Sequence, residues 1–259
     1  MNIVFLTADE PLYLPAFFAR VLQHRARDTR AIFMAPSRYG HDTTLHMVRK
    51  YTAAFGVWNL LRLMRRLGTV KVLGRLGRGG GDRYYSVPAA AVGYGIPCEL
   101  ISDVNDPAFL ERLRAMEADL IVSVSCPQLF RKPLIELPAL GCLNMHGALL
   151  PKYRGIAPSF WMMVHGETHA GVTVFFVNQD IDAGDIVEVE AFDIGPDESL
   201  HDFIIRSKRI ACDVLLRAIQ KVEDGTVSTQ PMRKEEGSYF GFPTREGYRE
   251  FRRRGRRLW

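Results

Sequence analysis

Asn144 and His146 are the residues of this 259-residue chain whose types and spacing most directly indicate chemistry. They end a short apolar run, Cys142 to Met145, that predicts a buried strand. Residues i and i+2 of an extended chain point to the same side, so the amide and the imidazole should lie next to each other. Such a pair suits acyl transfer, in which one group stabilises an oxyanion and another moves a proton.

A second loop could bring carboxylates to the same place. Two β-rich runs, residues 171–177 and 186–194, are joined by a short loop that holds a glycine and three carboxylates, Asp180, Asp182 and Asp185. Taken one at a time, Asn144, His146 and Asp182 could equally be a strand cap, a partner for backbone groups and a turn residue. Taken alone, each residue leaves the catalytic and the structural interpretation open.

Together these segments resemble the folate-dependent formyltransferase family. That family has an Asn-x-His before a Leu-Leu-Pro-x-Tyr-Arg-Gly loop, here Leu149 to Gly155, and an Asp-x-Gly turn some three dozen residues later. The likeness covers about residues 95–225 and is closest to the catalytic domains of methionyl-tRNA and amino-sugar formyltransferases. It implies an N-formyltransferase that uses 10-formyltetrahydrofolate and needs no metal.

The resemblance also implies roles for the three polar residues. Asn144 would donate an N–H to the oxyanion of the tetrahedral intermediate. His146 would hydrogen-bond that oxyanion or pass a proton to the leaving folate nitrogen. Asp182 would hold the imidazole or order a water that takes the amine proton, and Asp185 is expected to be structural.

The folate pocket implied by the resemblance lies against two loops, one after the run 118–125 and one at 178–182. Its candidate residues are Gln128, Leu129, Phe130 and Asp180, although Phe130 could equally belong to the core. Three histidines lack a metal-ligand spacing and are expected to be surface residues or supporting residues near the site: His165, His169 and His201.

Composition limits the other classes of function. Hydrophobic and charged contents of 47% and 24% are ordinary for a globular protein. Four scattered cysteines, the absence of a signal-peptide pattern and the absence of a long apolar run predict a reduced cytoplasmic enzyme. The net charge of +5 is uneven, because residues 41–83 carry nine Lys/Arg with two Asp, and residues 244–259 carry seven Arg with two Glu.

The elements that must position these residues alternate between strands and helices. Strands are expected at 3–7, 31–35, 97–102 and 118–125, with helices at 12–23 and 107–118, the first of them capped by Asp9. This alternation predicts an α/β, doubly wound, Rossmann-like sheet with the site at the carboxyl ends of its strands. Two antiparallel strands and a helix over 200–223 should complete a catalytic domain of residues 1–225.

Two basic segments depart from this plan. Residues 42–80 form an insertion with an amphipathic helix over 44–67 that Gly56 could break, followed by a glycine-rich loop or phosphate nest at 74–81. We expect the insertion to pack beside the acceptor cleft and offer it three arginines, Arg62, Arg65 and Arg66. Binding to a partner subunit or an anionic surface is the alternative.

Residues 226–259 form a short extension whose aromatics could dock on the domain and leave its arginines to an anionic partner, or simply be a solvated end. The extension is too short for the C-terminal barrel of a tRNA formyltransferase. With Arg154 in the loop, this favours a small anionic amine acceptor, such as a nucleotide-linked amino sugar. Methionyl-tRNA is less favoured. A nucleic-acid or membrane-surface binding protein on a catalytically idle fold is the alternative of another class.

Overall fold

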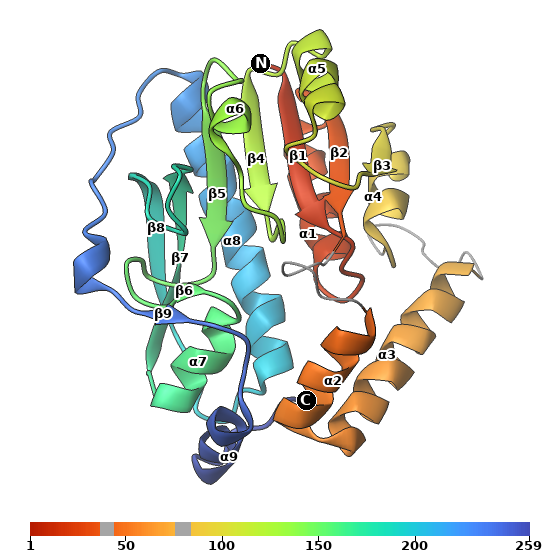
Figure 1. Ribbon diagram of the computed structural model, residues 1–259, viewed down its shortest axis with the longest axis vertical. Coiled ribbons are helices and arrows are strands. Elements are labelled where there is room, and N and C mark those ends of the chain that lie inside the picture. The colour runs from red at the N-terminus through yellow and green to blue at the C-terminus, as the bar shows by residue number, and fades with distance from the viewer. Residues whose placement is uncertain (37–43, 76–83) are drawn as a thin grey trace.

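A seven-stranded mixed sheet forms the centre of the protein in this computed structural model, which describes residues 1–36, 44–75 and 84–259. The strand order is β3-β2-β1-β4-β5-β7-β8, and the first five strands are parallel, whereas β7 and β8 run antiparallel to their neighbours (Figure 1). The strands are β1 (Ile3–Ala8), β2 (Thr29–Ala35), β3 (Cys98–Leu100), β4 (Leu120–Val124), β5 (Cys142–His146), β7 (His169–Phe176) and β8 (Ile186–Asp193).

Helices cover both faces of the sheet, which confirms the predicted α/β doubly wound fold. One face packs against α1 (Leu14–Arg25), α4 (Val87–Gly93) and α8 (Leu200–Glu223). The other face packs against α5 (Pro107–Ala115) and α6 (Lys132–Ile135). Because helices shield both faces, β1 and β4 are buried along their whole length, which explains their continuous apolar runs.

Helix ends mostly follow the sequence signals, with one correction. Asp106 and Ser199 accept backbone N–H bonds at the starts of α5 and α8, as capping residues do. The expected cap of the first helix, Asp9, was wrong. The carboxylate of Glu10 accepts instead from the N–H groups of residues 12–14, and the helix begins two residues later than predicted, at Leu14.

The insertion is a helical hairpin rather than one helix. Helix α2 (Thr44–Phe55) and helix α3 (Val57–Arg75) meet at Gly56, whose φ of +83° is a left-handed conformation that favours glycine. The predicted break is therefore confirmed, whereas the predicted end at residue 67 falls eight residues short. The glycine-rich segment lies mostly outside the described residues.

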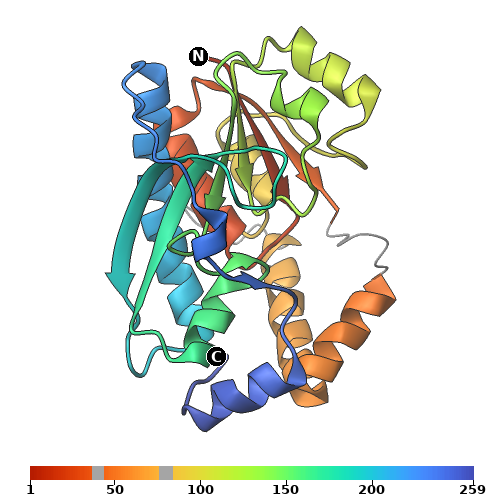
Figure 2. The same ribbon diagram turned by 60° about the vertical axis from the view of Figure 1, so that its left-hand side comes forward.

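The C-terminal segment packs on the domain by its aromatic side chains. It contains the 3₁₀ turn η1 (Lys234–Glu236), strand β9 (Tyr239–Phe240), which pairs with β6 (Arg154–Gly155), and helix α9 (Arg245–Arg253). Phe251 of α9 is fully buried in a cluster with Phe160 of α7 (Pro158–His165). Figure 2 shows α9 beside the α2–α3 hairpin at one end of the molecule.

Helical segments long and apolar enough to cross a membrane are absent from residues 1–36, 44–75 and 84–259.

Candidate active site

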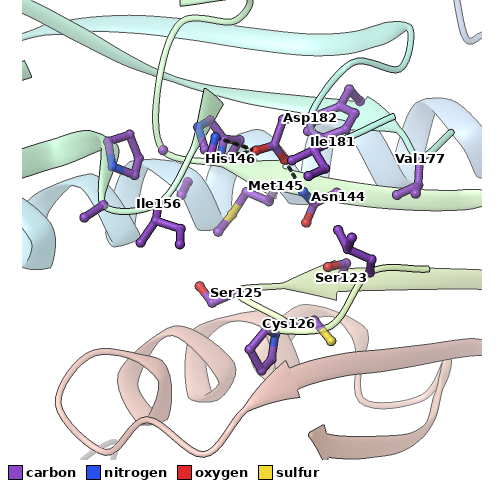
Figure 3. Close-up of a pocket in the computed structure, with 18 of the residues that line it drawn as sticks. Ser123, Ser125, Cys126, Asn144, Met145, His146, Ile156, Val177, Ile181 and Asp182 are labelled. Atoms are coloured by element: carbon purple, nitrogen blue, oxygen red, sulfur yellow. Dashed lines mark hydrogen bonds and ion pairs between the residues drawn. The ribbon is translucent and has the colours of Figure 1, made fainter. Parts of the chain in front are cut away.

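Asn144, His146 and Asp182 meet at the end of β5, as their spacing predicts. The Asn144 amide donates to Oδ1 of Asp182 at 3.4 Å, and Nδ1 of His146 lies 3.7 Å from Oδ2 (Figure 3). Strand β7 pairs antiparallel with β5, so the loop that follows β7 returns past these side chains and delivers Asp182. The carboxylate therefore lies between the amide and the imidazole.

The imidazole of His146 is held in one orientation by the Leu149 to Gly155 loop. Its Nε2 lies 2.7 Å from the backbone oxygen of Tyr153. A carbonyl oxygen only accepts, so Nε2 carries the hydrogen and Nδ1 is the nitrogen left to face Asp182. A ring held in this way, with a carboxylate beside Nδ1, suits a group that donates to an oxyanion or a leaving nitrogen.

Asp182 is itself fixed by backbone groups. The N–H of Gly155 donates to its Oδ2 at 2.9 Å, and the residue adopts a φ of +46°. Two residues on, a Cβ at Gly184 would overlap the carbonyl oxygen of Phe176, so only glycine fits this turn. The Asp-x-Gly spacing thus reflects a turn that aims the carboxylate at the strand end.

Unusual backbone conformations concentrate around this cluster. Of the five described non-glycine residues with positive φ, four lie in the loops that surround it, namely Ser125, Tyr153, Ala157 and Asp182. Each such residue costs on the order of 1–3 kcal/mol and persists only where its surroundings hold it. Such strain is typical of sites in which loops must place functional groups accurately.

A cavity of about 560 Å³ opens over the cluster, within the range of small-molecule sites. Gln128, Leu129 and Phe130 line it, as expected for the folate pocket. They differ in character: the Gln128 side chain is bonded to backbone groups of residues 102 and 104, Leu129 is 65% exposed, and Phe130 is buried. Phe130 therefore serves both the core and the cavity wall.

Asp180 and Arg154 occupy the rim of the site. Asp180 lines the cavity and is bonded to Lys234, whose ammonium lowers the pKa of that carboxyl. Arg154 is absent from the cavity lining. Its guanidinium donates to the backbone oxygen of Ile181 at 3.3 Å, and its buried Nε has no partner in the part of the chain that the structure describes. Arg154 therefore supports the loop that carries Asp182.

The three arginines of the insertion face different surroundings. Arg66 points inward, 3.0 Å from Nε2 of His201 and over the ring of Trp259. Arg62 and Arg65 are exposed and line neither the cavity over Asn144 nor a smaller cavity beside Tyr13 and Trp259. The binding of an acceptor by Arg62 and Arg65 therefore stays a prediction.

Lys208 is a cavity residue that the sequence analysis missed. Its ammonium donates to the Ser125 hydroxyl at 2.9 Å, and burial lowers its pKa from 10.5 to about 8 although the Glu10 carboxylate opposes the shift. A signal was present in the sequence. Lys208 interrupts an apolar stripe of the predicted helix, between Ile204 and Ala211. A lysine at such a position needs a polar partner, because its ammonium lies among mostly apolar side chains.

A second cavity of about 280 Å³ shares the Leu200 wall with the first. It lies between the insertion, the start of α1 and the C-terminal Trp259. The hydroxyl of Tyr13 is 2.9 Å from Nδ1 of His201, and burial, with the Arg66 charge, lowers the pKa of that imidazole. Because Arg66 can only donate to Nε2, the neutral ring carries its hydrogen on Nδ1.

No group of three or more His, Cys, Asp or Glu placed to hold a metal ion occurs within the described ranges. The four cysteines are free thiols. Burial raises the pKa of Cys142 to about 12, so this residue behaves as a core side chain.

Comparison with known proteins agrees with this geometry. Residues 101–219 match the family model described as formyl transferase. A methionyl-tRNA formyltransferase of Syntrophus aciditrophicus (strain SB) is 40% identical over 156 residues, which are 59% of this chain and 49% of that protein. The chain thus spans about half the length of this relative.

Two solved structures share the fold at low sequence identity. A sugar N-formyltransferase from Shewanella sp FDAARGOS_354 has a TM-score of 0.59 and 17% identity, covering 93% of this chain and 76% of that one. An N-formyltransferase from Helicobacter canadensis, in complex with folinic acid and dTDP-3-aminofucose, has a TM-score of 0.57 and 16% identity, covering 93% and 71%. The matched segment, residues 101–219, belongs to the formyl transferase family and contains all three residues of the cluster at the end of β5.

Proposed function

We propose that this protein transfers the formyl group of 10-formyltetrahydrofolate to the amino group of a small, anionic acceptor such as a nucleotide-linked amino sugar. The observation that carries the proposal is the convergence of Asn144, His146 and Asp182 inside a cavity of about 560 Å³. This arrangement offers a donor for an oxyanion, a group that can move a proton, and a carboxylate between them.

The chemistry begins with attack of a neutral acceptor amine on the formyl carbon. The carbonyl oxygen becomes an oxyanion, which the Asn144 amide stabilises, typically by about 3 kcal/mol. Asp182, directly or through a water, takes the proton that the amine loses. Asp182 passes this proton to Nδ1 of His146. Collapse of the intermediate breaks the bond to the folate nitrogen, which takes the proton from the imidazolium, so both side chains end in their starting states.

The donor fits the cavity on two grounds. Exposed apolar side chains, Leu129 and Ile181, stand at its wall, where a flat pterin or aminobenzoyl ring could be buried. The polar groups gather at one place, around Asn144. The Helicobacter canadensis structure is a complex with folinic acid, which supports the same class of donor.

A small acceptor is favoured by the second cavity, which adjoins the first and holds about 280 Å³. Its walls include Tyr13 and His201, and Arg66 lies behind it with a positive charge. We propose Arg154, Arg62 and Arg65 as further acceptor-side residues. Methionyl-tRNA is the second candidate, supported by the relative that is 40% identical.

The test is a formyl-transfer assay across a panel of acceptors. The protein is incubated with 10-formyltetrahydrofolate and either amino sugars linked to UDP or dTDP or methionyl-tRNA, and the formylated product is detected by mass spectrometry. Turnover of an amino sugar alone supports the favoured acceptor class, whereas turnover of methionyl-tRNA alone overturns it in favour of the tRNA.

Alanine variants test the cluster itself. Asn144→Ala, His146→Ala and Asp182→Ala should each slow formyl transfer about a hundredfold or more at saturating substrates, because each removes a group that acts at the reacting atoms. Asp185→Asn, an exposed carboxylate of the same loop outside the cavity lining, is the matched control and should retain activity. Near-native turnover of any alanine variant removes that residue from the mechanism. If the wild-type protein transfers no formyl group to any amine of the panel, a binding protein on a catalytically idle fold is favoured.

A further inference from the structure

The outer face of the α2–α3 hairpin exposes large apolar side chains. On α3, Trp58 is 80% exposed, and Val57, Leu61, Met64 and Val72 are each more than half exposed. Val57, Leu61, Met64 and Val72 lie four, three and eight residues apart, so they form one stripe along the helix, about 22 Å long. Trp58 adjoins the start of this stripe. Soluble proteins rarely leave such a continuous apolar stripe uncovered.

The pose of the hairpin is fixed by its other face. Phe55 is buried, with its ring 5.6 Å from that of Phe160 and 5.4 Å from that of Tyr248. The Asn59 amide donates to the Tyr248 hydroxyl at 2.8 Å, and Arg66 stacks on Trp259. The hairpin is therefore held firmly on the domain by its inner face. The apolar stripe lies on the opposite face and is exposed for that reason.

The same face is strongly basic. Residues 44–75 contain seven Lys or Arg and no Asp or Glu. Arg62, Arg65 and Lys71 are exposed beside the stripe, and none of them pairs with a carboxylate within the described part of the chain. Helices with an apolar stripe flanked by cations, and with Trp and Leu on the stripe, are typical of elements that lie in the interface of an anionic bilayer.

We propose that the α2–α3 hairpin docks this protein on an anionic phospholipid surface, with the stripe among the acyl chains and the flanking cations at the headgroups. The hairpin would lie in the plane of the interface and would not cross it. The apolar part of this inference is independent of the proposed activity, because none of the stripe residues lines the cavity over Asn144, whereas Arg62 and Arg65 are also proposed on the acceptor side.

Charge argues against the two other occupants. A second copy of the chain, docked face to face, would bring Arg62, Arg65 and Lys71 against the same cations of its partner, with no acidic residue of 44–75 to separate them, which is unfavourable. A nucleic acid would satisfy the cations but leave Trp58, Leu61 and Met64 without an apolar environment. An anionic lipid surface meets both features of this face.

Vesicle flotation tests the proposal on the full chain. Binding to vesicles of POPC with about one quarter POPG should be at least tenfold tighter than binding to pure POPC, and it should weaken as salt is added. Trp58 emission should shift to the blue on binding, and this shift should be missing in Trp58→Phe. Equal binding to both vesicles, or none to either at low salt, overturns the proposal.

Two double variants separate the apolar and basic contributions. Trp58→Ser/Met64→Ser and Arg62→Gln/Arg65→Gln should each weaken binding to the mixed vesicles about tenfold or more. The matched controls Val92→Ser/Leu100→Ser and Arg112→Gln/Arg114→Gln change equally exposed residues on other elements and should bind like the wild type. Unchanged binding in the serine variant overturns the role of the stripe.

Three further outcomes are decisive. Asn144→Ala should bind vesicles like the wild type, so the lipid proposal stands even if the activity proposal fails. Altered vesicle binding by Asn144→Ala would show that the two proposals are not independent. A dimer in light scattering that the serine variant abolishes assigns the stripe to a second copy and overturns the lipid proposal. Binding to RNA that displaces the vesicles, and that needs the arginines but not Trp58, overturns it in favour of nucleic acid.

Discussion

At the scale of single residues, Asp182 is the link within the proposed catalytic cluster. Its carboxylate contacts the Asn144 amide, faces the His146 imidazole and accepts from the Gly155 N–H. With Nε2 of His146 committed to Tyr153, the remaining ring nitrogen points at this carboxylate. Proton movement at the site therefore centres on one carboxylate–imidazole pair.

Lys208 gives a prediction for the pH dependence of stability. Burial lowers its pKa to about 8 in the folded protein, against 10.5 in an unfolded chain. Between these values the unfolded chain binds more protons, so this residue makes wild-type stability rise with pH from about 8 to 10.5, and it costs stability below that window.

Lys208→Met should therefore stabilise the protein near pH 7, by about 1–2 kcal/mol after the loss of the Ser125 hydrogen bond. The gain should shrink above pH 8 and vanish near pH 10.5, as measured by urea unfolding at several pH values. Lys132→Met, at a 65% exposed side chain, should change stability little at any of them. A gain for Lys208→Met that does not vary with pH would contradict the assignment.

At the scale of elements, the antiparallel return of β7 and the turn after it decide where Asp182 lies. The carboxylate reaches β5 only because residues 182–185 turn tightly against the end of β7. The contact between Gly184 and the backbone of Phe176 sets how tight this turn is.

Gly184→Ala should destabilise the fold by about 1–3 kcal/mol or more, because its Cβ would overlap the Phe176 carbonyl and push the turn outward. Formyl transfer should fall as Asp182 moves from β5. Gly68→Ala is the control, since that helical glycine has nothing within 4 Å of a Cβ and should gain up to about 1 kcal/mol. Urea unfolding measures both, and a Gly184→Ala protein of wild-type stability would show that the turn can relax.

At the scale of the whole molecule, the insertion and the C-terminal segment close one side of the domain together. Phe55 of α2 and Phe251 of α9 both pack on Phe160 of α7, and Trp259 meets Arg66. Segments far apart in the sequence thus lie side by side (Figure 2). Residues from both line the second cavity.

Folate binding should be visible as a change in global stability. At a concentration of 5-formyltetrahydrofolate near a hundred times its Kd, the folded state should gain about 2.7 kcal/mol. This corresponds to a rise of about 5 °C or more in Tm for a chain of this size. The shift measured by calorimetry should be the same with EDTA present. No shift and no heat of binding would show that the cavity does not take folate.

The sequence by itself determined the fold class, the placement of Asn144 beside His146 and most element positions. Uninterrupted apolar runs require strands shielded on both faces, and the i, i+2 spacing of Asn144 and His146 puts both on one side of β5. The helix predicted from Leu200 to about Glu223 agrees with α8, because Ser199 caps its start and Gly225 follows its end. These features depend on neighbours in the chain.

Tertiary structure alone decided what depends on distant segments. Whether Lys208 points into a cavity, and which face of α3 is covered, depends on segments more than eighty residues away. An amphipathic pattern shows that a helix has two faces, but only packing shows which one the protein buries, and in α3 the apolar stripe is the face left open.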